Sequence, residues 1–384
     1  MKRASIPRRL RAAAALLAMA AASGCGRAIY AVGSLADPAP ADSVELTLVL
    51  IGDAGLPNPA GEPVLQALER ELARDPERSY VVFLGDNIYP IGLSDTTTVE
   101  GREGLRILRA QMEPLLRTGA PGLFVPGNHD WAAGDVTGWN AIVRQERFLN
   151  EEGGGIVRME PRDGCPGPVV VDVGRVLRVL AIDTQWWLHG GPKPGPDRCT
   201  PGTEEGVVEA LRTALAGADG RRTVVVAHHP IVSGGQHGGY FDWPTYLFPL
   251  HPWARLSGVF ARQDVTGREY RHMTTQLARA FAAEQPTVYA AGHDHNLQVF
   301  RRDPAHYLVV SGGGFYGHTT RTRAITGVRY IRAASGYQRI HFLPDGRARL
   351  SVMVVDAQGN AEEDFSEWLE LPPLRRAPID AVLP

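Results

Sequence analysis

Short apolar, β-branched runs alternate with amphipathic helical patterns through the first half of the chain. The pattern predicts strands at 44–51, 80–84 and 123–125, and helices at 62–74 and 105–116 between them. A strand and helix order of this kind is typical of a sheet whose strands are joined by helical crossovers.

The second half of the chain contains more predicted strands than helices. Helices are expected at 139–149, 204–215 and 273–283, and strands at 169–171, 176–182, 223–227, 287–290, 297–300 and 307–310. Two further runs, 338–342 and 349–354, flank a Pro-Asp-Gly turn and predict a hairpin. The surplus of strands favours an α/β fold in which two sheets pack face to face.

Composition narrows the class of protein. The chain has 384 residues and a formal charge of -2, which suits one large globular domain or two small ones. The 40 basic and 42 acidic residues nearly balance, and no Lys/Arg run lies within the folded part. No nucleic-acid binding is therefore expected.

The N-terminus is typical of an export signal. A basic cluster precedes the apolar segment 12–23, which is too short for a transmembrane helix of ~20 residues. We predict a signal peptide over 1–25 and a flexible tether over 26–43. Ala22-Ser23-Gly24-Cys25 resembles a lipoprotein signal, which would lipidate Cys25 and attach the protein to a membrane in the bacterial periplasm or at the cell surface. A signal peptidase site with an incidental cysteine is the alternative.

The two remaining cysteines, Cys165 and Cys199, lie in Gly/Pro-rich turns away from the predicted strands. In an exported protein they are expected to form one disulfide. Two unpaired surface thiols are the alternative.

Polar side chains follow five of the predicted strands, in four cases beside a glycine. Taken singly, each has an ordinary explanation as a helix cap, a turn residue or a packed histidine. Together they offer oxygen and nitrogen donors suited to transition metals, and two metals sharing a carboxylate would use nearly all of them. The segments are Gly52-Asp53-Ala54-Gly55, LGDNIYP at 84–90, PGNHDW at 126–131, AHHP at 227–230 and AGHDHNLQ at 291–298.

The blocks GDAG, GDNIY, GNHD, AHHP and GHDHN, in this order, resemble the five blocks of the calcineurin-like metallophosphoesterases. The resemblance covers roughly residues 46–311. It implies a four-layer αββα sandwich, with two mixed sheets flanked by helices, in a single domain over 44–384. The chain between His228 and His293 is longer than expected, which predicts an insertion at about 235–270.

One departure refines the resemblance. Most members of the family have Asp-x-His in the first block, but here the third position is Gly55. Purple acid phosphatases also lack this histidine and use a tyrosine three residues after the bridging aspartate, where this chain has Asp86 and Tyr89. The sequences of the blocks most resemble those of the tartrate-resistant type of purple acid phosphatase.

This resemblance implies a ligand set for two metal ions. Asp53, Tyr89 and His295 would bind the first ion, Asn128, His228 and His293 the second, and Asp86 would bridge them. A phenolate ligand favours Fe(III) in the first site, whereas the second suits divalent Fe, Zn or Mn. The alternative for Tyr89 is an aromatic side chain that only packs on the sheet edge.

The implied reaction is hydrolysis of a phosphate ester by direct attack of a metal-bound hydroxide. His129 and His237 are the candidate proton donors to the leaving group, although His237 could instead be a solvated surface residue. His229 stands where relatives usually have tyrosine, so its role is open. Asp294 is expected to be structural, and Asp130 is expected to orient His129.

The expected activity is that of an exported acid phosphatase acting on small phosphate esters or phosphoproteins. A phosphodiesterase or nucleotidase using the same site is the first alternative, and a non-catalytic surface lipoprotein is the second. The predicted insertion contains an aromatic stretch, 240–253, that could form a wall for an organic leaving group or cover a sheet edge.

Overall fold

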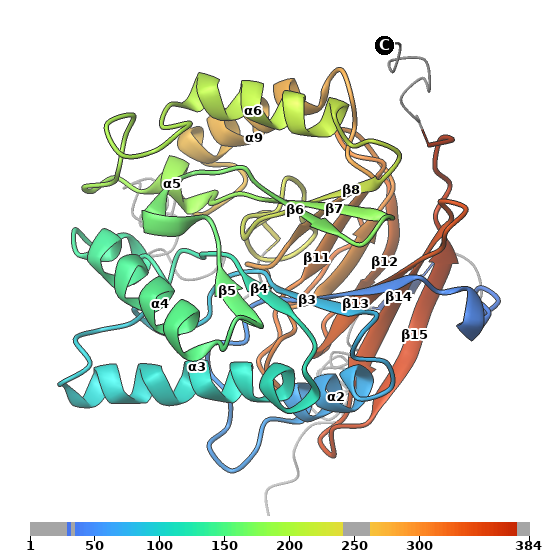
Figure 1. Ribbon diagram of the computed structural model, residues 1–384, viewed down its shortest axis with the longest axis horizontal. Coiled ribbons are helices and arrows are strands. Elements are labelled where there is room, and N and C mark those ends of the chain that lie inside the picture. Colours follow the sequence, from blue (N-terminus) through green and yellow to red (C-terminus); the bar gives the residue numbers. More distant parts are fainter. Residues whose placement is uncertain (1–28, 32–34, 241–261, 375–384) are drawn as a thin grey trace, which may run out of the picture.

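A computed structural model describes residues 29–31, 35–240 and 262–374 (Figure 1). The predicted signal peptide over 1–25 lies outside the described residues. The same holds for the aromatic stretch 240–253 apart from Tyr240.

Two mixed sheets form the centre of the fold. In order, the eight-stranded sheet contains β1 (Ile29–Ala31), β12 (Val328–Arg332), β10 (Leu297–Phe300), β11 (Tyr307–Ser311), β9 (Val288–Ala291), β8 (Arg222–Val226), β7 (Leu177–Ala181) and β6 (Val169–Val173). The seven-stranded sheet contains β15 (Ala361–Trp368), β14 (Ala348–Val355), β13 (Gly336–Phe342), β2 (Leu46–Ile51), β3 (Ser79–Phe83), β4 (Gly122–Phe124) and β5 (Val157–Met159).

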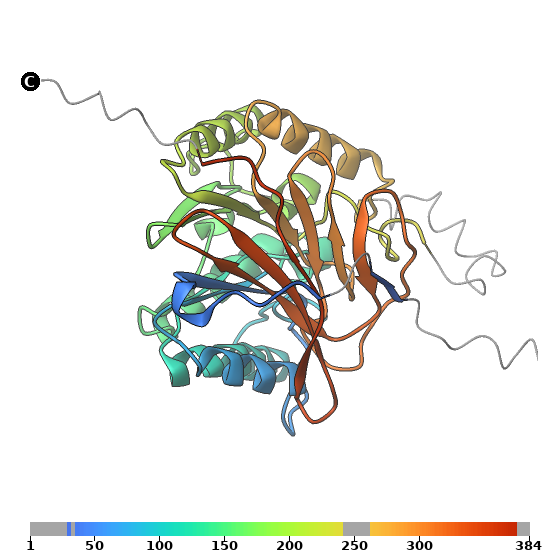
Figure 2. The ribbon, with the colours of Figure 1, turned by 90° about the vertical axis from the view of Figure 1, so that its right-hand side faces the viewer.

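Helices cover the outer face of each sheet, as Figures 1 and 2 show. The seven-stranded sheet carries α2 (Pro63–Leu72), α3 (Val99–Thr118) and α4 (Gly138–Glu152). The eight-stranded sheet carries α5 (Gln185–Leu188), α6 (Glu204–Ala216) and α9 (Arg268–Phe281). The predicted four-layer αββα sandwich is confirmed. None of the helices in the described ranges is long and apolar enough to cross a bilayer.

Strand β2 shows why the predicted strands are apolar at nearly every position. Leu48 and Leu50 pack between the two sheets, whereas Val49 and Ile51 pack under the helices. All four are fully buried, and each contributes about 1.5–3 kcal/mol by leaving water. A strand covered on both faces has no solvent-facing side, so its sequence is a continuous apolar run.

The strand directions determine where the loops meet. Strands β2, β3, β4 and β5 are mutually parallel, and so are β7, β8, β9 and β11. The carboxyl ends of parallel strands lie at one edge of a sheet, which is where α/β folds place their ligands. The polar segments that follow β2, β3, β4, β8 and β9 are therefore brought together.

Part of the predicted tether packs on the domain. Strand β1 pairs with β12, and the guanidinium of Arg349 donates hydrogen bonds to the carbonyl oxygens of Ala36 and Asp37 at 2.8 and 3.0 Å. The prediction of a flexible tether over 26–43 therefore does not describe these residues. The predicted disulfide between Cys165 and Cys199 is confirmed, and it joins loops 34 residues apart in the sequence.

Strand β15 carries a carboxylate that is bound by one arginine of the adjacent strand β14 and one of β13. Glu363 accepts hydrogen bonds from Arg349 at 2.6 and 3.0 Å and from Arg339 at 3.2 Å. Burial alone would raise the pKa of Glu363, but the hydrogen bonds from Arg349 and from two serines lower it to about 2. The charged form of Glu363 is therefore stabilised by folding.

We expect Glu363→Gln to lower the free energy of unfolding by about 1.5–3 kcal/mol at pH 7, because a charged hydrogen-bonded pair is lost. Since the folded pKa lies below the ordinary value of 4.5, the stabilisation is fully present above that value and is lost as the pH falls toward 2. Thermal unfolding at several pH values checks this. The exposed neighbour Glu362→Gln is the control, and a constant difference between pH 7 and pH 2 would contradict the assignment.

Candidate metal centre

Two aspartates begin the site, each at the end of a parallel strand. Asp53 follows β2 and Asp86 follows β3, and both adopt left-handed backbone conformations, with φ of 59° and 52°. Aspartate tolerates this region better than most residues, and such conformations concentrate at functional sites. Gly127 makes room for Asp86, because a Cβ at position 127 would lie 2.3 Å from Asp86 Oδ1.

A first cluster of donor atoms surrounds the Tyr89 hydroxyl. Tyr89 Oη lies 2.9 Å from Asp53 Oδ1, 3.1 Å from Asp86 Oδ2 and 2.9 Å from His295 Nε2. His295 Nε2 is also 3.4 Å from Asp53 Oδ1. These four residues come from three loops, and they are the set predicted for the first metal ion together with the bridging carboxylate.

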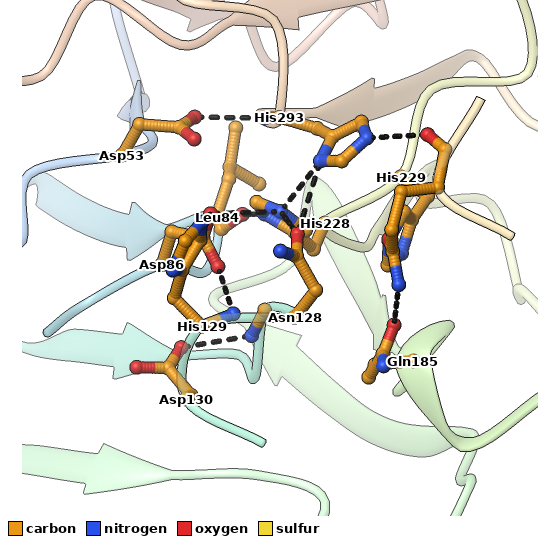
Figure 3. Close-up of polar contacts among 12 residues, drawn as sticks. Asp53, Leu84, Asp86, Asn128, His129, Asp130, Gln185, His228, His229 and His293 are labelled. Atoms are coloured by element: carbon orange, nitrogen blue, oxygen red, sulfur yellow. Dashed lines mark hydrogen bonds and ion pairs between the residues drawn. The ribbon is translucent and has the colours of Figure 1, made fainter. Parts of the chain in front are cut away.

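A second cluster lies around the Asn128 side chain (Figure 3). Asn128 Oδ1 is 3.0 Å from His228 Nε2 and 3.1 Å from His293 Nδ1, and the two imidazole nitrogens are 3.1 Å apart. His228 Nε2 lies 3.4 Å from Asp86 Oδ2. The structure thus brings together all three residues predicted for the second ion.

Asp86 belongs to both clusters. Its Oδ2 faces Tyr89 on one side and His228 on the other, while its Oδ1 accepts a hydrogen bond of 2.8 Å from the backbone N–H of His129. The backbone contact fixes the carboxylate and leaves Oδ2 between the clusters. This is the arrangement expected of a bridging ligand.

Backbone carbonyls orient two of the histidines. His228 Nδ1 donates to Leu84 O at 2.9 Å, and His293 Nε2 donates to Gln263 O at 2.8 Å. When each ring is neutral, these nitrogens carry its proton, and His228 Nε2 and His293 Nδ1 are then the atoms that would present lone pairs to a bound cation. Outer contacts of this kind fix the tautomer of metal-binding histidines.

The site concentrates negative charge, and no lysine or arginine of the described residues forms an ion pair with it. Asp53 and Asp86 are 0% and 2% exposed, and in the described part of the chain only histidines pair with them. Burial and the charges of both aspartates raise the pKa of Tyr89 well above its ordinary value. Burial also opposes ionisation of Asp86, but the charges of His228 and His129 lower its pKa overall. A phenol held between two buried carboxylates needs a strong cation before it can ionise.

The two predicted proton donors lie one beside each cluster. His129 Nδ1 donates to Pro90 O at 2.6 Å, and its Nε2 lies 3.9 Å from Asp86 Oδ2. The ring of His237 lies 3.9 Å from the ring of His293, and its Nδ1 donates to Asp264 Oδ1 at 3.2 Å. Both imidazoles are about one-third exposed, at 30% and 31%, so a substrate can reach them.

Three site residues were missed by sequence reasoning. Gln263 and Asp264 lie near the end of the predicted insertion at about 235–270, where no local pattern marks them. His318 lies in the loop after β11, with its ring 4.5 Å from that of His295 and stacked on Phe315 at 4.9 Å. Only contacts between distant segments reveal these three residues.

The structure resolves the open questions on His229 and Asp294. His229 lies with His228 and His293 in a group of donors within 4.8 Å of one another. However, its Nε2 faces Gln263 Oε1 at 2.7 Å, which turns it away from the clusters. Asp294 is structural as expected, because it accepts hydrogen bonds from the Ser233 hydroxyl and from the backbone N–H of His237.

The role expected for Asp130 is wrong. Its carboxylate accepts hydrogen bonds from the backbone of Asn87 and Gly127 and from Gln145 Nε2, and it makes no hydrogen bond to the His129 side chain. Burial and the charge of Asp86 raise the pKa of Asp130 to about 6. Asp130 therefore joins the loops that follow β3 and β4.

Comparison with known proteins supports this arrangement. The family model described as calcineurin-like phosphoesterase matches residues 46–297, which is more than half of the chain. The chain belongs to the calcineurin-like phosphoesterase family. It is accordingly a phosphate ester hydrolase, and the resemblance seen in the five sequence blocks is confirmed.

Individual relatives are distant. Purple acid phosphatase 4 of Arabidopsis thaliana is 21% identical over 354 residues, covering 86% of this chain and 87% of that protein. The purple acid phosphatase PPD1 of yellow lupin has a TM-score of 0.55 at 18% identity, covering 86% of this chain and 55% of the lupin chain. GAP50, the anchor in the inner membrane complex of Plasmodium, has a TM-score of 0.51 at 15% identity, covering 87% of this chain and 90% of GAP50. The two solved structures show the same fold as this phosphoesterase.

Proposed function

We propose that this phosphoesterase is an exported phosphomonoesterase of the purple acid phosphatase type with a dinuclear metal centre. The observation that carries the proposal is the pair of donor clusters that share Asp86 Oδ2. In the described ranges no lysine or arginine pairs with the buried carboxylates of Asp53 and Asp86, and a cation between them would offset the cost of burying their charges. A shared carboxylate is the usual link between two ions in enzymes that cleave phosphate esters.

The donor sets fit two different ions. Asp53, Tyr89 and His295 would hold the first, and their anionic oxygens suit Fe(III). Asn128, His228 and His293 would hold a divalent Fe, Zn or Mn ion, and Asp86 would bridge the two. When bound, the ions would offset phosphate charge and supply an activated water as the nucleophile.

The protein's own residues would move the proton to the leaving group. His237 is suited to this role because Asp264 accepts its Nδ1–H, so that in the protonated ring the Nε2–H is the proton that can pass to the leaving group. Burial lowers the pKa of His237, but the hydrogen bond to Asp264 and the charge of Asp294 raise it overall. On the other side of the site, the backbone carbonyl of Pro90 accepts the Nδ1–H of His129 and orients that ring.

We expect His237→Gln to lower kcat for an alkyl phosphate by about 100-fold or more, since general acids contribute ~10²–10⁴-fold. Hydrolysis of p-nitrophenyl phosphate should fall far less, because nitrophenolate leaves without a proton. Steady-state kinetics with both substrates check this. His272→Gln, an exposed histidine of α9, is the control. Equal losses on the two substrates would show that His237 is not the proton donor.

The iron assignment is tested by the visible spectrum of the oxidised protein beside its Tyr89→Phe variant. Tyrosinate bound to Fe(III) absorbs visible light by charge transfer, so the wild type should be coloured and the variant should lose the band. A colourless wild type with full iron occupancy would reject the purple type. The family assignment would stand in that case.

Export is supported by the N-terminal pattern over 1–25 and by the Cys165–Cys199 disulfide, because disulfides persist in oxidising compartments. We further propose that Cys25 carries a lipid that attaches the protein to a membrane. Mass spectrometry of the mature N-terminal peptide tests this, and an unmodified or absent Cys25 would reject the lipid anchor.

A further inference from the structure

Gln263 makes three polar contacts at the second cluster. Its backbone carbonyl accepts the hydrogen bond of 2.8 Å from His293 Nε2. Its side chain lies between two other residues, with Oε1 2.7 Å from His229 Nε2 and Nε2 donating to Gln185 Oε1 at 3.0 Å. One residue therefore joins a predicted metal ligand to a buried histidine and to α5.

These partners define the protonation of His229. Gln263 Nε2 donates to Gln185, so Gln263 Oε1 is the acceptor and His229 Nε2 must carry a proton. His229 Nδ1 then accepts from the Thr184 hydroxyl at 2.8 Å. Because both ring nitrogens are engaged, His229 holds the Gln263 side chain and does not bind metal.

The residues after Gln263 support the proton donor. Asp264 accepts the hydrogen bond from His237 Nδ1, and the backbone N–H of Val265 donates to His237 O at 2.9 Å. The rings of His237 and His293 lie 3.9 Å apart. The segment 263–265 thus contacts two neighbouring histidines of the site.

We propose that Gln263 is a positioning residue for the second metal site. Held by His229 and Gln185 through its side chain, it keeps its carbonyl where it orients His293 Nδ1 toward Asn128 and His228. The inference rests on the proposed dinuclear function and adds to it a residue that touches neither ion. Loss of an outer contact to a metal-binding histidine typically weakens metal affinity by ~10- to 100-fold.

The test uses Gln263→Met, which keeps the length of the side chain and removes its polar atoms. Purified full-length protein is loaded with Fe(III), and Zn(II) is then titrated against a chromophoric chelator. We expect zinc affinity to fall by ~10- to 100-fold, with the iron absorption band unchanged because Tyr89 and His295 lie in the other cluster. Gln358→Met, at an exposed turn between β14 and β15, is the control. Gln263→Glu restores the acceptor for His229 and should recover most of the affinity.

The outcomes separate the two proposals. If the wild type binds fewer than two ions per chain, the dinuclear function fails, and the role of Gln263 fails with it. If the wild type binds two and Gln263→Met binds zinc equally well, only the positioning role is overturned. If circular dichroism shows that Gln263→Met is unfolded, Thr184→Val removes the hydroxyl that holds His229 without changing shape. That variant must then show the same selective loss of zinc.

Discussion

Asp86→Asn is expected to lose about 100-fold or more of the wild-type kcat/KM and to bind fewer than two metal ions per chain. Loss of an outer-shell partner already costs ~10- to 100-fold, and Asp86 Oδ2 faces both donor clusters directly. Asparagine keeps the shape and tolerates the φ of 52°, so the loss should come from the missing charge. Metal analysis by mass spectrometry and steady-state kinetics measure the two effects.

Asp219→Asn is the matched control for this variant. Asp219 also has a left-handed backbone, with φ of 56°, but it lies exposed between α6 and β8. We expect its activity and metal content to equal those of the wild type. An Asp86→Asn protein with two tightly bound ions would show that Asp86 is not the bridge.

Gly55→Ala is expected to lower the free energy of unfolding by about 1–3 kcal/mol, as overpacking does. A Cβ at position 55 would lie 2.5–2.6 Å from backbone atoms of Asp86, Asn87 and Ile88. Gly55 O also accepts the backbone N–H of Tyr89 at 3.0 Å, so a shifted loop would displace the tyrosine. Thermal unfolding and the intensity of the iron band measure the two consequences.

Gly195→Ala is the control, because a Cβ there meets only Asp197 Oδ1 at an ordinary 3.4 Å. Gly55→His, which restores the histidine of other family members, should be at least as destabilising as Gly55→Ala. A stable, fully coloured Gly55→His protein would contradict the close approach at this position. Packing against residues 86–88 therefore requires glycine at position 55, and this requirement also removes the histidine ligand found in other family members.

Much of the fold followed from the sequence because β2, β3, β4, β8 and β9 are buried on both faces, and such strands are marked by apolar runs. Strand β15 was missed because its sequence, AEEDFSEW, is acidic. Its acidic side chains form ion pairs with arginines of β12, β13 and β14, as with Glu363 and Arg349, and these pairs are visible only once the fold is known. Helix α3 begins at Val99 and not near 105 as predicted. The Thr98 hydroxyl accepts a hydrogen bond from the backbone N–H of Gly101, and this cap offsets the unfavourable helix propensity of two glycines in the first turns.

Most of the candidate ligands were found because they lie in short polar segments that directly follow a strand, and four of the five segments contain a glycine. Tyr89 was found only through the family resemblance, by its place three residues after Asp86. Gln263, Asp264 and His318, which lie beside the ligands, were not found, because no local sequence pattern distinguishes them. The orientation of a histidine depends on which carbonyl or amide lies behind it, and that partner is usually far away in the sequence. Gln263 and His293, for example, are 30 residues apart.

The two clusters draw on both sheets. Asp53, Asp86, Tyr89 and Asn128 follow strands of the seven-stranded sheet, whereas His228, His293 and His295 follow strands of the eight-stranded sheet. Each ion would therefore be a cross-link between the layers, and neither half of the chain could hold one alone. Metal binding would then require that the two sheets are already packed together. Removing the ions with a chelator would weaken the contact between the two sheets at the edge that holds the site.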